Sequence, residues 1–245
     1  MDMKIVIIGY GKMGKMVEQE AIKSQIPVSK IINNRDNLLS HNFKNDEIAI
    51  EFTEPSTCLE NIEIISSKGI NMVCGTTGWY NDIQKIQKLV AINNIGFIYA
   101  SNFAVGVNIF WKMIKEASLV IDKFEDYDVM GHEIHHNKKK DSPSGTALTT
   151  AQIIIDNIAR KKQIITEKVD REMKSDEIHF NSSRCGSVIG THEVIFDSPI
   201  DYIKISHNSK GRDSYAKGAI NCAKWIKNKK GFYSIENYME ELLNA

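Results

Sequence analysis

The segment from Glu133 to Ala147 gathers side chains that can transfer a proton and bind an anion. It contains two imidazoles, His135 and His136, and the lysine run 138–140, followed by Ser-Pro-Ser-Gly-Thr. An imidazole titrates near neutral pH and can act as an acid or a base, while an ammonium group stabilises negative charge. We therefore predict a carboxylate or phosphate site with a proton donor beside it.

A helix is predicted to start within this segment. Small and apolar residues recur near three-to-four spacing, which indicates an amphipathic helix capped by Ser144 or Ser142; they are Ala147, Leu148, Ala151, Ile154 and Ile155. The N–H groups of Gly145 and Thr146 then face the loop, where a helix end attracts anions. Lysine runs are also typical of solvated surfaces, and adjacent histidines can simply cap or pack, so the segment alone leaves both interpretations open.

A second motif, near the N-terminus, indicates a dinucleotide site. A short apolar strand from Met3 leads into Gly9-Tyr10-Gly11-Lys12-Met13-Gly14 and then a helical stretch to about Lys23. In this strand–turn–helix context, Gly9 permits the tight turn, Gly11 lets a pyrophosphate approach the backbone, and Gly14 lets helix and strand pack closely. Tight turns of this kind also occur without nucleotides, but the context favours dinucleotide binding.

The end of the second predicted strand, which runs from Val28 to about Asn33, bears on the choice between NAD and NADP. An acid there would bind the ribose diol of NAD, but this chain has Asn33-Asn34-Arg35, and the first acid is Asp36. Arg35 could hold a 2′-phosphate, so we predict that NADPH is favoured or at least tolerated. The alternative is that Arg35 is an ordinary surface arginine.

The elements up to about Phe103 alternate between strand and helix. Strands are predicted near 48–52, 71–74 and 96–100, and helices near 56–68 and 82–93. This alternation predicts a parallel sheet whose ligands lie beyond the carboxyl ends of its strands. Three loops fall there and suit contacts with a nicotinamide ribose and amide, although they are also ordinary turns: Phe52-Thr53-Glu54-Pro55, Gly75-Thr76-Thr77-Gly78 and Ala100-Ser101-Asn102-Phe103.

The pattern changes after Phe103. A helix near 108–122, a strand near 127–135 and two alternating stretches, 187–196 and 200–207, predict an α+β domain whose sheet builds an oligomer. The polar segment 160–183 is expected to be a long surface loop with one short strand or helix. Helices are predicted near 212–227 and 234–243.

Composition excludes several classes of partner. The 245 residues suit one large or two small domains, and 31 basic against 31 acidic residues argue against a nucleic-acid surface. No apolar run approaches the ~20 residues of a membrane span, so we expect a cytoplasmic protein without an anchor or a signal peptide. The scattered cysteines, and lysines that would repel a cation from His132, His135 and His136, lead us to expect no metal.

Taken together, the motifs resemble the 4-hydroxy-tetrahydrodipicolinate reductase family, formerly called dihydrodipicolinate reductase, over nearly the whole chain. The matching motifs are Gly9-x-Gly11-x-x-Gly14, Phe52-Thr-x-Pro55, Gly75-Thr-Thr-Gly78, Asn102-Phe-x-Val-Gly-Val-Asn108, Glu133-x-His-His-x-x-Lys-x-Asp-x-Pro-Ser-Gly-Thr-Ala147, Arg184-x-Gly186, Gly190-x-His192, and His207 through Arg212 to Gly218-Ala219. The His-His to Thr-Ala segment is highly specific, whereas the glycine turn alone is not.

The resemblance implies an α/β fold with a Rossmann-like parallel-sheet nucleotide domain from 1–104 and 217–245. A second α+β domain, 105–216, would contain a mixed, open sheet that binds substrate and joins a homotetramer. The implied activity is the reduction of 4-hydroxy-tetrahydrodipicolinate, via dihydrodipicolinate, to tetrahydrodipicolinate. NADPH and/or NADH would supply the hydride, in the diaminopimelate route to lysine.

The resemblance also implies roles for individual residues. His135 would be the acid/base and Lys139 its cationic partner, and the substrate carboxylate would be held by His136, Ser144, Gly145 and Thr146. The cofactor would contact Gly9, Tyr10, Gly11, Lys12, Met13, Gly14, Asn34, Arg35, Phe52, Gly75, Thr76, Thr77, Ala100, Ser101, Asn102 and Phe103. Lys138 and Lys140 are expected to be solvated.

The chain departs from the family pattern in a few places. The family commonly has the longer turn G-x-x-G-x-x-G and often an acid after the second strand, so cofactor preference stays open. Ser209 and Tyr215 stand where alanine and phenylalanine are usual, and we expect tolerated packing changes. Two rival interpretations are another small Rossmann dehydrogenase, for instance one acting on an amino-acid semialdehyde, and a nicotinamide-sensing regulator without turnover.

Overall fold

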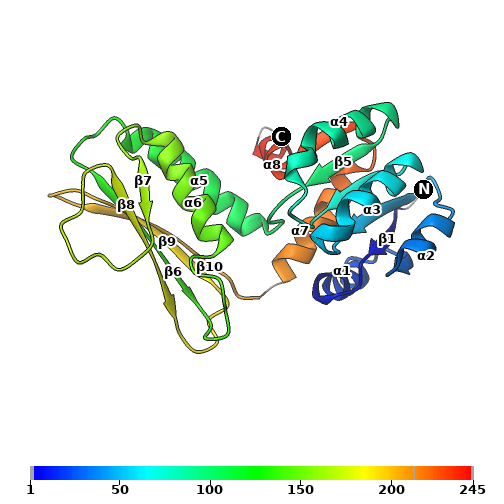
Figure 1. Cartoon of the computed structure of the whole chain (residues 1–245), viewed down its shortest axis with the longest axis horizontal. Helices are drawn as coiled ribbons and strands as arrows, with labels where there is room; N and C mark the ends of the chain where they lie inside the picture. Colours follow the sequence, from blue (N-terminus) through cyan, green and yellow to red (C-terminus); the bar gives the residue numbers. More distant parts are fainter. Residues whose placement is uncertain (1–2, 212, 244–245) are drawn as a thin grey trace. The chain divides into compact units, whose positions relative to one another are not determined.

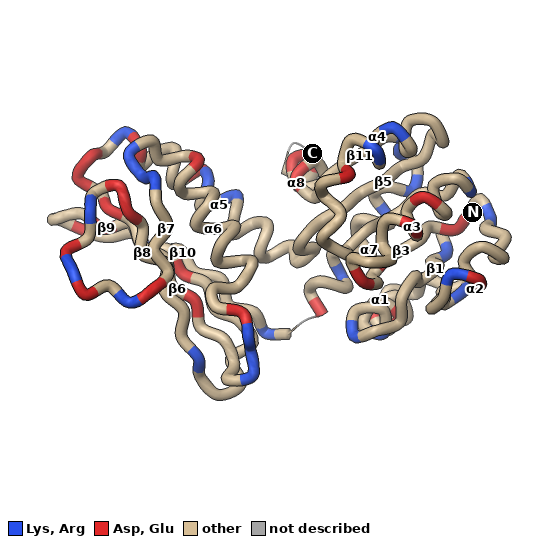
Figure 2. Tube along the Cα trace, in the orientation of Figure 1, with Lys and Arg blue, Asp and Glu red and all other residues tan. Residues whose placement is uncertain are grey.

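The computed structural model describes residues 3–211 and 213–243, which cluster into two compact units (Figure 1). The first unit contains the chain up to Val105 together with the chain from Asp213 onward, and the second contains the segment between them. Acidic and basic residues are interspersed within each unit (Figure 2). Among the described residues, no helix is long and apolar enough to cross a membrane.

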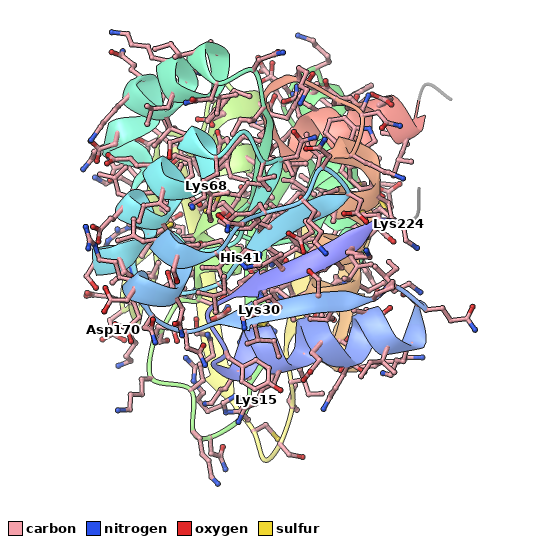
Figure 3. The ribbon with its side chains drawn as sticks, turned by 90° about the vertical axis from the view of Figure 1, so that its right-hand side faces the viewer. Lys15, Lys30, His41, Lys68, Asp170 and Lys224 are labelled. Atoms are coloured by element: carbon pink, nitrogen blue, oxygen red, sulfur yellow. The ribbon has the colours of Figure 1, made fainter. Side chains whose placement is uncertain are left out.

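The first unit is built on a six-stranded parallel sheet in the order β11-β5-β4-β3-β1-β2. Its strands are β1 (Lys4–Ile8), β2 (Val28–Ile32), β3 (Glu47–Glu51), β4 (Met72–Cys74), β5 (Gly96–Tyr99) and β11 (Gly231–Ser234). The chain order reverses between β1 and β3, which is where sheets of this kind bind ligands. At the opposite end from β11, edge strand β2 exposes Lys30 (Figure 3), a charge that discourages pairing with another chain.

Helices cover both faces of this sheet because its central strands are apolar on both sides. Ile5 and Ile7 pack in the cluster that contains residues of α1 (Lys12–Lys23), α7 (Asp213–Ile226) and α8 (Ile235–Leu243). Val6 and Ile8 pack on the other side, in the cluster that contains residues of α2 (Arg35–Ser40), α3 (Pro55–Ser67) and α4 (Ile83–Ile92), which follows a 3-10 turn at Tyr80–Asp82. The expected Rossmann-like layering is confirmed. The short elements α2 and β11 were not expected.

The second unit packs helices α5 (Val105–Ile121) and α6 (Gly145–Asn157) on one face of a five-stranded sheet, in the order β10-β9-β6-β8-β7 (Figure 1). The strands are β6 (Asp128–His135), β7 (Gln163–Ile165), β8 (Glu177–Arg184), β9 (Thr191–Asp197) and β10 (Tyr202–Asn208). Because β6 pairs parallel with β8 and antiparallel with β9, the expected mixed sheet is confirmed. Trp111 Nε1 donates to Thr150 Oγ1 at 3.0 Å and so joins the two helices.

The expectation of a mainly irregular loop over 160–183 is wrong, since β8 is an eight-residue strand within the sheet. The polar sequence Asn-Ser-Ser within β8 does not indicate a strand, but Ile178 and Phe180 are buried. The ring of Phe180 fills the space that a side chain at Gly131 would need: an added Cβ would lie 2.2 Å from it. The predicted strand 187–196 begins only at Thr191, and the predicted helix start at Arg212 lies outside the described residues.

Candidate functional site

A row of polar side chains crosses the sheet of the second unit. Glu133 on β6 lies opposite Ser182 on β8 and His192 on β9, and His192 lies opposite His207 on β10. Residues that are directly opposite each other share one face of a sheet, here the face that carries the helices. His135 lies two residues beyond Glu133 on the same strand, so its side chain shares this face.

Glu133 lies at the centre of this row and is fully buried. Its Oε1 accepts hydrogen bonds from Ser144 N at 2.9 Å and Ser182 Oγ at 2.8 Å, and its Oε2 accepts one from Ser144 Oγ. His192 Nε2 lies 3.3 Å from the same Oε2. Burial by itself raises the pKa of Glu133. The hydrogen bonds from His192, Ser144 and Ser182 to the carboxylate outweigh this effect and hold the pKa at about 2. The side chain is therefore a carboxylate at neutral pH.

His135 is 7 % exposed, and its Nδ1 lies 3.4 Å from Oε2 of Glu133. Its ring meets that of His192 edge-on, with centroids 5.2 Å apart. Burial lowers the pKa of His135 to about 4; Glu133 opposes this shift, while His192, Lys139 and Arg184 add to it. His135 is therefore neutral at pH 7 in the unliganded protein.

The lysine run behaves as three separate residues. Lys139 is half-buried, and its Nζ lies 2.9 Å from both carboxylate oxygens of Asp141, whereas Lys138 and Lys140 are exposed, as expected. Arg184 holds the loop from β8, donating to the backbone oxygens of Lys139 at 3.4 Å and Asp141 at 2.6 Å. The ammonium group of Lys139 is therefore already paired with a carboxylate of the same loop.

Ser144 caps α6, and its Oγ accepts a hydrogen bond from Ala147 N at 3.2 Å. Of the two cap candidates, Ser144 is therefore correct. Gly145 and Thr146 form the first turn, where backbone N–H groups have no carbonyl partner inside the helix. A Cβ added to Gly145 would meet nothing within 4 Å, so its backbone is open to a ligand. His136 precedes the loop and has a buried Nδ1 without a hydrogen-bond partner among the described residues.

In the first unit, the three glycines of the turn differ in what surrounds them. Gly9 has φ +87°, and an added Cβ would lie 2.2 Å from Phe52 O, so only glycine fits there. A Cβ on Gly14 would lie 2.1 Å from Gly9 O, while one on Gly11 would meet nothing within 4 Å. Gly9 and Gly14 therefore serve the fold, and Gly11 leaves room for a ligand.

A cavity of about 410 Å³ lies beside this turn, at the ends of β1, β2 and β3. Its lining includes the stretches 9–11, 33–35 and 52–54, and also Glu60 on α3. Asn34 caps α2 by accepting from Asn37 N at 2.8 Å. Arg35 Nε donates to Glu60 Oε1 at 2.5 Å, so the candidate phosphate-binding guanidinium is paired with an acid. Position and size suit the adenosine half of a dinucleotide.

Tyr10, Lys12 and Met13 complete the turn beside this cavity. Tyr10 lines it and donates its hydroxyl hydrogen to Glu18, while Lys12 and Met13 begin α1. The other loops that were predicted to bind the cofactor pack against one another around the side chain of Phe52. The ring of Phe52 occupies the space above Gly75, where an added Cβ would lie 2.0 Å from it, and it meets Phe103 edge-on at 6.2 Å.

The loops after β4 and β5 divide into internal and outward-facing groups. Thr76 Oγ1 is used internally, accepting from Thr53 N at 2.8 Å, and Asn102 Oδ1 accepts from Ala104 N at 2.8 Å. Ala100 is buried, whereas Thr77 and Ser101 are exposed. Asn102 Nδ2 also approaches the Tyr215 hydroxyl at 3.5 Å, so the unusual tyrosine has a polar neighbour.

Among the described residues, two groups have ligand atoms that all lie within 4.8 Å of one another, as a metal ion would need: Glu133, His135 and His192, and Glu51, Cys58 and Cys74. In the first group the carboxylate already accepts hydrogen bonds from serines, and Lys139 and Arg184 lower the pKa of His135, which disfavours a cation. In the second, both thiols donate to Glu51 Oε2 at 3.4 Å. Hydrogen bonding accounts for both groups.

The sequence interpretation did not single out Ser182, and Glu133, Arg184 and His192 entered it only as parts of motifs, without a role of their own. One local signal was available for Glu133, because its two-residue spacing from His135 in a strand places both side chains on one face. The pairing with Ser182 and His192 depends on strand register and had no local signal.

Comparison with known proteins fits this geometry. The family models for the N-terminus and the C-terminus of dihydrodipicolinate reductase match residues 3–103 and 106–239. The chain belongs to the dihydrodipicolinate reductase family. Membership confirms the expected family and the expectation of an oxidoreductase that uses a nicotinamide cofactor.

Curated relatives align with most of the length of this chain. The chain is 35% identical over 243 residues to the 4-hydroxy-tetrahydrodipicolinate reductase of Christiangramia forsetii, covering 98% of this chain and 99% of the relative. It is 35% identical over 192 residues to the 4-hydroxy-tetrahydrodipicolinate reductase of Methanocaldococcus jannaschii, covering 77% of this chain and 69% of that relative. Among solved structures, the dipicolinate-bound dihydrodipicolinate reductase from Paenisporosarcina sp. TG-14 has a TM-score of 0.75 at 24% identity, over 97% of this chain and 99% of that one. This likeness supports the fold.

Proposed function

We propose that the protein reduces 4-hydroxy-tetrahydrodipicolinate, via dihydrodipicolinate, to tetrahydrodipicolinate in the diaminopimelate route to lysine. The observation that carries the proposal is one loop of the second unit that brings together a buried imidazole, a lysine and a helix N-terminus. A small dicarboxylate with a reducible ring needs all three: two anion contacts and a proton. The names of the relatives support the same substrate.

In this proposal the second unit holds the dicarboxylate. His136 and the backbone N–H groups of Gly145 and Thr146 bind one carboxylate at the start of α6, and Ser144, whose N–H and hydroxyl both donate to Glu133, fixes the position of these groups. Lys139 stabilises negative charge on the substrate, and a substrate carboxylate takes the place of Asp141 beside its Nζ. The exchange costs little electrostatically because one carboxylate replaces another.

His135 supplies the proton. A nicotinamide cofactor held by the first unit would supply a hydride to a ring carbon, and His135 gives the one proton that neutralises the electron density left in the conjugated ring. His135 is neutral in the free protein, but two nearby substrate carboxylates favour its charged form and raise its pKa. Substrate binding thus charges the acid that the reaction consumes.

The first unit serves as the dinucleotide-binding domain. The turn 9–14 holds the pyrophosphate, and Asn34 and Arg35 line the cavity for the adenosine. Gly75, Thr77, Ala100 and Phe103, which lie outside this cavity, are proposed to flank the nicotinamide. NADPH and NADH both fit this proposal, with Arg35 as the contact to a 2′-phosphate. The second unit serves for substrate binding and oligomerisation, in a protein that works in the cytoplasm.

We further propose a homotetramer that is joined through the sheet of the second unit. The sheet face opposite α5 and α6 carries half-buried or exposed apolar side chains, including Met130, Ile134, Ile195 and Tyr202. Met130 and Ile195 lie directly opposite each other on β6 and β9, so the apolar side chains adjoin. A sheet face of this composition packs well against a second sheet.

Calorimetric titration with pyridine-2,6-dicarboxylate, with and without NADPH, tests the substrate assignment. The planar dicarboxylate should bind, and more tightly with the cofactor present. Absence of binding in both conditions would reject the assignment. Nucleotide binding without any dicarboxylate affinity would instead favour a nicotinamide-sensing regulator.

A further inference from the structure

Glu133 contacts both parts of the proposed site, the imidazole and the helix start. Its Oε2 lies 3.4 Å from His135 Nδ1 and accepts the Ser144 hydroxyl, while its Oε1 accepts the Ser144 N–H at 2.9 Å. We propose that Glu133 is the positioning residue of this site, whose buried carboxylate fixes His135 with Nδ1–H inward and anchors Ser144 at the start of α6. This inference rests on the proposed function only for its kinetic readout.

The surroundings of the His135 ring support one orientation of its proton. Nδ1 is buried and makes no hydrogen bond within the described part of the chain, and an uncharged nitrogen without a proton would face the carboxylate of Glu133 with its lone pair. A proton on Nδ1 removes that repulsion. Catalytic hydrogen bonds are often long before ligand binding and tighten in the complex, so 3.4 Å suits a contact of this kind.

The opposite nitrogen is the one left for the substrate. His135 Nε2 faces Gly190, where an added Cβ would lie only 3.0 Å away. Gly190 has no side chain to crowd this nitrogen, although the site is otherwise packed. With Nδ1 fixed toward Glu133, Nε2 is the atom that can exchange a proton with a ligand.

At the helix start, Ser144 is held by both its groups. Its backbone N–H and hydroxyl both donate to Glu133, and the same hydroxyl oxygen accepts from Ala147 N at 3.2 Å. Since the cap sets where the first free N–H groups of α6 lie, Glu133 sets the position of the anion site relative to His135. The carboxylate of Glu133 thereby fixes the position of the proposed acid, His135, relative to the proposed anion site at the start of α6.

The negative charge of Glu133 matters as well as its shape. The charged and titratable groups that face His135 are Glu133 on its own strand, His192 on β9, Lys139 in the following loop and Arg184 on β8. Glu133 is the acidic member of this set and favours the imidazolium, whereas the other three disfavour it. Replacing the carboxylate by an amide should therefore make His135 harder to protonate in the substrate complex.

Glu133→Gln tests the proposal, with Ser182→Ala as the matched control. Ser182 donates to Oε1 at 2.8 Å, away from the histidine side, so its removal leaves the charge and the Oε2 contacts in place. We expect Glu133→Gln to lower kcat by at least about tenfold and to move the alkaline limb of the pH–rate profile to lower pH. Ser182→Ala should leave the limb unmoved. An unmoved limb in Glu133→Gln, at any activity, would overturn the proposal.

A measurement on the wild-type protein keeps the proposal testable even if Glu133→Gln does not fold. Nitrogen-15 NMR of the histidine ring should show neutral His135 with its proton on Nδ1. A proton on Nε2 would overturn the positioning role whatever the substrate is. By contrast, a wild-type protein that shows Nδ1–H at His135 but neither turnover nor binding of pyridine-2,6-dicarboxylate would reject the proposed function and leave the Glu133 contact standing.

Discussion

At the scale of single residues, the surroundings of His135 and Lys139 suit the negatively charged ligand that we propose. His135 is buried, neutral and close to cations, and the Nζ of Lys139 is paired with Asp141. Both arrangements hold the unliganded site close to electrical balance. A bound dicarboxylate would change both residues. Its negative charge favours the protonated form of His135, and one of its carboxylates replaces Asp141 beside the ammonium group of Lys139.

Binding of pyridine-2,6-dicarboxylate at pH 6.5 should therefore be accompanied by proton uptake. The free protein holds His135 at a pKa of about 4, so the ring is neutral at this pH, and a nearby dianion raises the pKa toward or above it. Calorimetry in buffers of different ionisation enthalpy measures the uptake. His135→Gln should abolish it and lower turnover by roughly 10²–10⁴. Near-normal turnover would reduce His135 to a binding role.

Cofactor preference should depend on Arg35 and its partner Glu60. Arg35→Ala removes the guanidinium and should weaken the binding of NADPH more than the binding of NADH. Glu60→Gln removes the acid that is paired with the guanidinium and should strengthen the binding of NADPH alone. Fluorescence titration of each variant with both cofactors measures the two ratios. Equal effects of Arg35→Ala on NADPH and NADH would show that Arg35 makes no contact with the 2′-phosphate.

At the scale of elements, the glycine turn separates stability from ligand binding. The turn closes between β1 and α1, where Gly14 contacts the backbone of Gly9 and Gly11 faces open space. The same division appears at α6, where Ser144 is tied into the structure and Gly145 is left open. Each helix start that we propose to bind a ligand thus combines one residue that fixes the backbone with one that leaves it accessible.

Gly11→Ala and Gly14→Ala should therefore fail in different ways. Gly11→Ala should fold with a normal melting temperature but lose dinucleotide affinity, since its Cβ would occupy space left for the pyrophosphate. Gly14→Ala should lower the melting temperature, since its Cβ would lie 2.1 Å from Gly9 O and helix and strand must separate. Thermal unfolding and nucleotide titration distinguish the two. A Gly11→Ala protein with unchanged affinity would contradict the assigned pyrophosphate site.

At the scale of the whole molecule, the two units divide the chemistry between them. The first unit carries the parallel sheet and the cavity proposed for the nucleotide, and the second carries the residues proposed for proton transfer and anion binding. In the second unit only one face of the sheet is covered by described helices, and the other face is partly apolar. This partly apolar face is the surface through which we propose that the subunits associate.

Ile195→Glu on that face should shift the protein from tetramer toward smaller species. The charge would lie beside Met130, its direct neighbour across β6 and β9, where a second sheet is proposed to pack. Ile92→Glu is the control, because Ile92 is 79 % exposed on α4 of the first unit and should leave the assembly unchanged. Sedimentation velocity measures both. A monomeric wild-type protein at micromolar concentration would contradict the proposed interface.

The sequence by itself determined the features that depend on neighbouring residues. The glycine turn, the alternation of strands and helices before Phe103, and the Ser144 cap are all set by local spacing and backbone preference, and each has the predicted form. The residues proposed for proton transfer and anion binding belong to one continuous segment, so they too could be predicted. A local pattern suffices wherever one element supplies the whole motif.

Only the tertiary structure decided which distant residues support that segment. Ser182 and His192 lie far along the chain from Glu133 and reach it through the register of β8 and β9, and β8 itself has a polar sequence that becomes a strand by pairing with β6. Arg35 meets Glu60 because α2 and α3 pack on the same face of the sheet. Cross-strand register and helix packing result from burying the core as a whole, and for that reason no local pattern specifies them.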